Sequence, residues 1–197
     1  MTVANILSIT RLVLVPLLVF AAFEQWHDLA FVIFVSAAIT DALDGWIART
    51  FDQRSRLGAI LDPAADKLML VSGYVVYTFH GIASEALPVA LTVSVFARDV
   101  LIVFVAWLLF SRVKVREFPP SILGKISTIL QAVALGVTIA ANTRLAPAAL
   151  PIIGVVHGLA LAMTIISGLD YVRRWGLILQ VKEWAERYGV ELLAGEE

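Results

Sequence analysis

The sequence predicts an all-α integral membrane protein with six transmembrane helices and a C-terminal amphipathic helix at the membrane interface. Of its 197 residues, 60% are hydrophobic and only 16% are charged, and the mean hydropathy is +0.88. Soluble domains are closer to half apolar and a quarter charged. The apolar residues also fall into six stretches that are long enough, at about 17 to 25 residues each, for helices that cross a bilayer.

The six predicted spans follow one another with short connections. They are 5–23, 29–50, 59–80, 86–110, 121–142 and 148–172. Pro119 and Pro120 end the fourth connection, and Ser121 is a suitable N-cap for the fifth helix. No basic region precedes the first apolar stretch and no small-residue cleavage pattern follows it, so we expect a retained helix rather than a signal peptide.

After Gly176 the sequence changes from an apolar to an amphipathic pattern. Apolar residues gather on one helical face, namely Leu177, Val181, Trp184 and Tyr188, and charged residues lie largely on the other, namely Lys182, Glu183, Glu186 and Arg187. This pattern is typical of a helix that lies on a membrane surface. We therefore expect a six-helix transmembrane domain over 1–175 and a cytoplasmic amphipathic tail over 176–197.

Basic residues distinguish the two sides of the predicted bundle. The connections after the second and fourth helices, with the C-terminal flank, carry Arg49, Arg54, Arg56, Arg112, Lys114, Arg116, Arg173 and Arg174. The opposite connections carry only Arg144. The positive-inside rule therefore predicts that both termini and the connection between the second and third helices are cytoplasmic.

Two pairs of aspartates lie within or beside apolar sequence around that connection. Asp41 and Asp44 are three residues apart, and Asp62 and Asp66 are four apart, so each pair shares one helical face. Four like charges need either raised pKa values or cations among them. Carboxylate oxygens at this density suit Mg²⁺ or Mn²⁺, which commonly bind through a few carboxylates and substrate phosphates. The stretch predicts a metal site that faces the cytoplasm and handles phosphate.

Small residues and an arginine accompany the acids. Gly45, Ala48 and Gly58 allow a helix or a ligand to approach the backbone. The guanidinium group of Arg49 has paired N–H donors that match phosphate oxygens. The alternative is an intramembrane ion-pair network of the acids with Arg11, Arg49 and Lys67. Ionisable groups at membrane depth are costly and more often functional, which favours the metal site.

The spacing of eight of these residues resembles the signature of the CDP-alcohol phosphatidyltransferase family. The eight are Asp41, Asp44, Gly45, Ala48, Arg49, Gly58, Asp62 and Asp66. The first helix is similar to the family's pattern at Asn5, Leu7, Ser8, Arg11 and Pro16, although Ala4 stands where a proline is usual. The fifth helix is similar to the phosphatidylglycerophosphate synthase branch at Gly124, Lys125, Thr128 and Gln131.

This resemblance implies transfer of a phosphatidyl group from CDP-diacylglycerol to an alcohol, with release of CMP, in a bacterial inner membrane. Two divalent ions, Mg²⁺ or Mn²⁺, would balance the four carboxylates, and we expect Asp41, Asp44 and Asp62 as ligands and Asp66 as both a ligand and the general base. The residues expected to bind the donor are Asn5, Gly45, Ala48, Arg49, Arg54 and Gly58. The resemblance also implies a homodimer, and we expect membrane lipids but no nucleic acid as partners.

The acceptor alcohol is less constrained. Glycerol 3-phosphate would need additional cations, which Arg98, Arg112 and Lys125 supply if the fourth and fifth helices line the pocket. The run at 167–171 also resembles phosphatidylglycerophosphate synthases. The alternative is a CMP-forming cardiolipin synthase that uses phosphatidylglycerol, because Arg98 is followed by Asp99 and no second arginine stands at Ala106. Gly124 departs from that second branch, which usually has serine there.

Two other function classes remain open. A transporter would also carry acids in the membrane, but it predicts acids spread through the span and a weak symmetry between two halves, which we do not find. An intramembrane prenyltransferase uses two aspartate-rich motifs with Mg²⁺, but its usual pattern lacks the glycine and Ala-Arg insertions. The absence of cysteine excludes disulfides and thiolate chemistry. We expect His27, His80 and His157 to be interfacial or packed rather than ligands.

Overall fold

The computed structural model describes residues 3–50, 58–79, 81, 83–113 and 121–188, and within these ranges the helices are joined by short turns and irregular segments, without a strand. The helices are α1 (Val3–Phe23), α2 (His27–Thr50), α3 (Gly58–Phe79), α4 (Val89–Val113), α5 (Ile122–Ala141), the short 3-10 helix η1 (Pro147–Ile152) and α6 (Ile153–Tyr188). The predicted all-α class is confirmed, and each predicted span corresponds to one long helix. Ser121 caps α5, where its side chain accepts the Gly124 N–H at 2.9 Å, as predicted.

The sequence did not predict η1. It begins at Pro147 and contains Pro151, and both prolines lack the N–H that an α-helix uses. The chain therefore makes a short 3-10 segment before α6 begins at Ile153.

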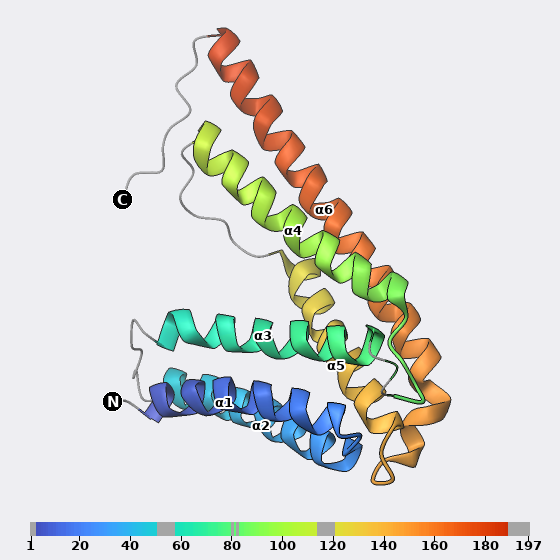
Figure 1. Ribbon diagram of the computed structural model, residues 1–197. Helices are drawn as coiled ribbons and strands as arrows, with labels where there is room; N and C mark the ends of the chain where they lie inside the picture. The colour runs from blue at the N-terminus through green and yellow to red at the C-terminus, as the bar shows by residue number, and fades with distance from the viewer. Residues whose placement is uncertain (1–2, 51–57, 80, 82, 114–120, 189–197) are drawn as a thin grey trace.

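The helices form two groups that α5 joins (Figure 1). In the first group α1 packs against both α2 and α3, and in the second α6 packs against both α4 and α5. α5 also contacts α2 and α3, so the two groups share one interior. In Figure 1 the start of α1, the end of α2, the start of α3 and the ends of α4 and α6 lie toward the same side of the molecule.

Small residues bring the helices close together. Ala21 and Ala30 have no exposed surface, and small side chains allow helix backbones to approach each other. Gly73 lies where α3 meets α5, and a Cβ atom there would be 2.5 Å from Leu135 Cδ2. A side chain at position 73 would force Leu135 to shift, so Gly73 allows the close packing of α3 against α5. This packing brings α5 next to the acids of α2 and α3.

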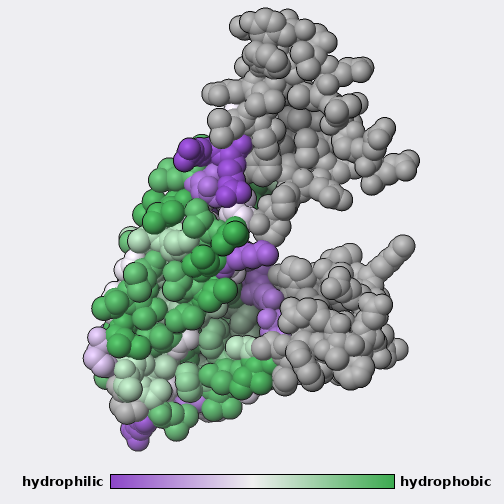
Figure 2. Space-filling view, turned by 180° about the vertical axis from the view of Figure 1, so that it is seen from behind, coloured by the Kyte–Doolittle hydropathy of each residue, from purple (hydrophilic) through white to green (hydrophobic). Residues whose placement is uncertain are grey.

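Apolar side chains cover most of the outer surface that the structure describes. Figure 2 shows a broad hydrophobic surface, with hydrophilic residues gathered near the junction of the two helix groups. Three helical segments are long and apolar enough to cross a membrane by length and composition, Val89–Trp107, Ile122–Ala141 and Ala148–Arg174. These features indicate a membrane protein. Six crossings stay a prediction, because α1, α2 and α3 have 21, 24 and 22 residues but are not among those segments.

α6 continues without a break through Gly176 to Tyr188, so the predicted domain boundary at 175/176 falls inside one helix. Its 36 residues extend about 54 Å at 1.5 Å per residue. The hydrocarbon core of a bilayer is only about 30 Å thick. The C-terminal part of α6 therefore has the length to extend beyond the bilayer, and its position on the membrane surface stays a prediction.

Buried polar groups tie α5 to α3 and α6. Gln131 is 1% exposed, and its Nε2 donates to Thr164 Oγ1 at 3.0 Å and to Ser127 Oγ at 3.2 Å. Tyr74 Oη donates to the Gln131 carbonyl at 3.0 Å. These hydrogen bonds satisfy polar groups that lipid and apolar side chains cannot satisfy.

Replacing Gln131 with leucine should lower the free energy of unfolding by about 0.5–2 kcal/mol, since interhelical hydrogen bonds in membranes have this strength. The loss should appear as a lower midpoint in denaturant titration of the detergent-solubilised protein. Val133→Leu, at a position 44% exposed on the same helix, is the control and should leave the midpoint unchanged. An unchanged midpoint for Gln131→Leu would mean that these hydrogen bonds add nothing to stability.

Candidate active site

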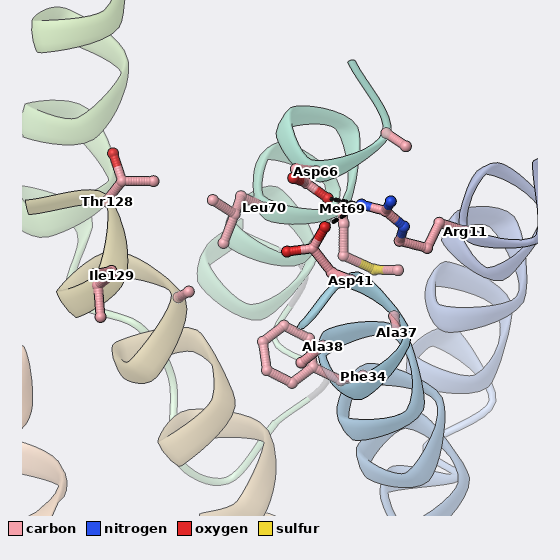
Figure 3. Close-up of a pocket in the computed structure, with 12 residues that line it drawn as sticks. Arg11, Phe34, Ala37, Ala38, Asp41, Asp66, Met69, Leu70, Thr128 and Ile129 are labelled. Carbon is pink, nitrogen blue, oxygen red and sulfur yellow. Dashed lines mark hydrogen bonds and ion pairs between the residues drawn. The ribbon is translucent and has the colours of Figure 1, made fainter. Parts of the chain in front are cut away.

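One arginine from α1 joins the acids of α2 and α3 (Figure 3). Arg11 Nη1 lies 2.6 Å from Asp41 Oδ1 and 2.5 Å from Asp66 Oδ1, so a single nitrogen contacts both carboxylates. The Arg11 side chain is 3% exposed, whereas those of Asp41 and Asp66 are 50% and 46% exposed. The Arg11 side chain is therefore buried, whereas the two carboxylates remain accessible to a ligand.

The carboxylates open into a cavity of about 260 Å³. Its other walls are Phe34, Ala37 and Ala38 of α2, Ala65, Met69 and Leu70 of α3, and Thr128, Ile129 and Ala132 of α5. Asp66 is eight residues from the start of α3, which is about 12 Å along the helix axis. The acids are thus set in from the helix ends, beside apolar walls.

The described acids suit a cation. Asp41 and Asp66 lie on different helices but converge on one positively charged nitrogen, and their oxygens are the hard ligands that Mg²⁺ and Mn²⁺ prefer. In the part of the chain with described side chains, no group of three or more histidines, aspartates and glutamates comes together. Asp44 and Asp62 lie on the helical backbones of α2 and α3, but their side chains fall outside the described part.

A second, basic cavity of about 740 Å³ adjoins the first. It is lined by Lys67, Arg98, Asp99, Ile102, Val103, Gly124, Lys125, Thr128, Ile129 and Tyr171. Thr128 and Ile129 line both cavities, so the acidic and basic sites are neighbours across α5. Its charged side chains are the cations of Lys67, Arg98 and Lys125 and the single carboxylate of Asp99. This excess of positive charge makes the cavity suited to an anionic group.

Arg98 is the most enclosed cation of the basic cavity, with 9% of its side chain exposed. Its Nη1 donates to Asp99 Oδ1 at 3.2 Å, and Asp99 also pairs with Lys67. Arg98 Nε is buried and finds no hydrogen-bond partner among the described residues. A buried donor without a partner costs about 1–3 kcal/mol.

The structure brings together four of the predicted site residues in these two cavities. Asp41 and Asp66 line the first cavity, and Arg98 and Lys125 line the second. For the remaining residues no side chain is described. Eight of them lie on helical backbone, namely Asn5, Asp44, Gly45, Ala48, Arg49, Gly58, Asp62 and Arg112. Arg54 lies outside the described residues.

Several residues of the site were missed from the sequence. Arg11 belongs to the first-helix pattern and to the ion-pair alternative, and Lys67 belongs to that alternative. Tyr171 belongs to the run at 167–171, and none of the three was predicted to line the site. Asp99 was used only to distinguish two acceptors. A charged residue inside an apolar helix is itself a functional signal, which Lys67 and Asp99 carry. Tyr171 carries no such signal, because its role depends on α4 lying against α6.

The described histidines lie at the opposite end of the bundle from the acids. His157 is buried with Nε2 2.7 Å from Thr138 Oγ1, and His27 Nδ1 lies 3.4 Å from Tyr77 Oη. Both are packed against hydroxyl groups, as predicted. His80 lies outside the described residues.

Comparison with known proteins gives the family. The sequence profile of CDP-alcohol phosphatidyltransferases matches residues 1–166, which is most of the chain and includes Arg11, Asp41, Asp66, Arg98 and Lys125. The chain belongs to the CDP-alcohol phosphatidyltransferase family. It is thus a phosphatidyltransferase by family, as the resemblance in the sequence indicated.

Relatives of this phosphatidyltransferase carry three different names. It is 32% identical to a probable phosphatidylglycerophosphate synthase of Mycobacterium tuberculosis over 184 residues, which cover 87% of this chain and 80% of the relative. It is 34% identical to the CDP-diacylglycerol–glycerol-3-phosphate 3-phosphatidyltransferase of Aquifex aeolicus over 135 residues, 68% of this chain and 74% of the relative. It is 41% identical to the human CMP-forming cardiolipin synthase over 103 residues, but these are 52% of this chain and only 33% of that protein.

Proposed function

We propose that the protein transfers a phosphatidyl group from CDP-diacylglycerol to glycerol 3-phosphate, forming phosphatidylglycerophosphate and CMP. The observation that carries this proposal is the basic cavity beside the one lined by Asp41 and Asp66, because Lys67, Arg98 and Lys125 face a single carboxylate there. A phosphomonoester carries up to two negative charges and several acceptor oxygens, which match Lys67, Arg98 and Lys125. The relatives that align over most of their length bear the corresponding names.

The proposed reaction divides its roles between the two cavities. Asp41, Asp44, Asp62 and Asp66 would hold divalent ions, Mg²⁺ or Mn²⁺, whose chemistry is to neutralise phosphate charge. The acceptor hydroxyl attacks the phosphatidyl phosphorus, the bond from that phosphorus to the CMP oxygen breaks, and CMP leaves with the bonding electrons. Asp66 takes the hydroxyl proton as general base. The charged donor headgroup would lie along Asn5, Gly45, Ala48, Arg49, Arg54 and Gly58, with its acyl chains in the membrane.

The orientation and assembly belong to the same proposal. The cavity lined by Asp41 and Asp66 lies toward the start of α1 and α3. By the positive-inside rule that side is cytoplasmic, where glycerol 3-phosphate would be available. An inner-membrane homodimer is expected from the family resemblance alone. Crosslinking of the protein in native membrane vesicles would test the dimer.

The second candidate is a CMP-forming cardiolipin synthase with phosphatidylglycerol as acceptor. The specific observation in its favour is the 41% identity to the human enzyme over 103 residues. A phosphodiester acceptor brings one negative charge and two acyl chains, so it would need fewer cations and an opening to lipid. The basic cavity favours the phosphomonoester.

The deciding experiment supplies CDP-diacylglycerol with one acceptor at a time. Purified protein is incubated with glycerol 3-phosphate, phosphatidylglycerol, serine or inositol, and both CMP and the lipid product are identified. We expect phosphatidylglycerophosphate only with glycerol 3-phosphate. Cardiolipin from phosphatidylglycerol would establish the second candidate, and no CMP with any acceptor would contradict phosphatidyl transfer to these alcohols.

Replacing Arg98 with lysine should raise the KM for glycerol 3-phosphate by about 10–100-fold, because charged hydrogen bonds contribute about 1.5–3 kcal/mol each. Lysine keeps the charge but loses Nε and the forked geometry. The KM for CDP-diacylglycerol should change little. Arg174→Lys is the matched control, since Arg174 is exposed and pairs with Asp170 on its own helix. Equal effects on both substrates would remove Arg98 from the acceptor site.

A further inference from the structure

The Arg98 guanidinium is fixed by groups from three helices. Besides Asp99 on α4, its Nη2 donates to the Gly124 carbonyl of α5 at 3.3 Å and to Ser167 Oγ of α6 at 3.4 Å. The ring of Tyr171 on α6 lies beneath it, with Arg98 Cζ 5.8 Å from the ring centroid, within the range of a cation–π interaction. The position of this cation therefore depends on how closely α4, α5 and α6 approach each other.

Gly124 lies close to both Arg98 and Tyr171. A Cβ atom at this position would lie 3.0 Å from Tyr171 Oη, 3.1 Å from Ser121 Oγ and 3.2 Å from Arg98 Nη2. Favourable contacts between side-chain atoms are about 3.5–4.0 Å, so at least one neighbour would have to move. Gly124 is α-helical and buried, so the need for glycine here comes from space and not from backbone conformation.

The three neighbours differ in how easily they move. Ser121 Oγ is held by its cap hydrogen bond with the Gly124 N–H. Tyr171 Oη is attached to a rigid, buried ring and accepts a hydrogen bond from the Ser121 N–H at 3.4 Å. Arg98 Nη2 is the end of a long, flexible side chain held by two weak hydrogen bonds of 3.3 and 3.4 Å. A side chain at 124 would therefore displace the guanidinium first.

We propose that Gly124 and Tyr171 are positioning residues that set where Arg98 presents its donors to the anionic group of the acceptor. Tyr171 supports the guanidinium from below, and the missing side chain of Gly124 leaves the space that the guanidinium fills. Both act through Arg98 on the affinity for the acceptor. This inference rests on the proposed acceptor site.

The test compares wild type, Gly124→Ala, Tyr171→Phe and the double variant in steady-state assays with both substrates. Gly124→Ala should raise the acceptor KM about tenfold while kcat and the KM for CDP-diacylglycerol stay within about twofold. Tyr171→Phe keeps the ring and should change the acceptor KM by less than about threefold. The double variant should be as impaired as Gly124→Ala, because removal of Oη leaves the added Cβ atom 3.2 Å from Arg98 Nη2.

The outcomes separate this inference from the proposed function. If wild type forms phosphatidylglycerophosphate but Gly124→Ala has a normal acceptor KM, the positioning role is wrong and the function stands. A double variant that regains the wild-type acceptor KM, or a loss spread over kcat and both KM values, would also overturn it. If wild type uses phosphatidylglycerol instead, the proposed function fails, and the same four proteins are compared with that acceptor under the same expectations.

Discussion

Replacing Asp66 with asparagine should slow phosphatidyl transfer by about 10²–10⁴-fold, the usual contribution of a general base. Asparagine keeps the size of the side chain but can neither take up the acceptor proton nor carry the negative charge that faces Arg11 Nη1 at 2.5 Å. Asp41 remains as a counter-charge to Arg11, so the helices should stay packed. The loss should therefore appear in kcat, measured as CMP release, while binding of CDP-diacylglycerol is largely retained.

A matched carboxylate gives the control for this experiment. Asp28 lies at the start of α2, at the other end of the bundle, where its Oδ1 accepts the Arg144 N–H at 3.0 Å. Asp28→Asn should leave turnover within about twofold of wild type. If Asp66→Asn turns over at the wild-type rate, the base assignment is wrong. If it loses CDP-diacylglycerol binding as well as turnover, Asp66 acts on the donor instead.

Replacing Arg11 with leucine should lower the free energy of unfolding by roughly 3 kcal/mol in the absence of divalent ions. Removing one partner of a buried ion pair usually costs about 3–5 kcal/mol, and the lower end applies because both carboxylates are about half exposed. Without Arg11, the carboxylates of Asp41 on α2 and Asp66 on α3 lose the cation between them and repel each other. Denaturant unfolding of the solubilised protein measures this loss directly.

Addition of Mn²⁺ distinguishes the charge of Arg11 from its packing. A divalent ion replaces the missing positive charge, so Mn²⁺ should stabilise Arg11→Leu more than it stabilises the wild type. Arg144→Leu, an exposed arginine at the opposite end, is the control and should show neither effect. Equal gains from Mn²⁺ in Arg11→Leu and wild type would show that the two aspartates do not hold the ion.

The helices were largely predictable from the sequence, because their signals are local. An apolar stretch of the right length, ended by charged residues or proline, predicted every long helix to within a few residues, except that α6 continues well beyond 172. The cap at Ser121 was also predictable, since a capping side chain bonds the backbone three residues away. The 3-10 segment η1 was missed because two prolines within an apolar run also fit the start of a span.

The site was predictable only in part. The pairing of Asp62 with Asp66, and of Asp41 with Asp44, follows from helical periodicity, and both Asp41 and Asp66 line the cavity. The sequence did not indicate which cation would face them. Arg11 is 30 residues from Asp41 and 55 from Asp66, and such distances carry no periodic signal.

The sequence by itself determined the membrane class, the number and approximate bounds of the long helices, and the acids that share a helical face, because each depends on residues at most about 25 positions apart. The tertiary structure alone decided that Arg11 joins Asp41 to Asp66, that Lys67 meets Asp99, and that Tyr171 supports Arg98. These contacts depend on which helix lies against which, and that is set by close packing at small residues such as Gly73 and Gly124.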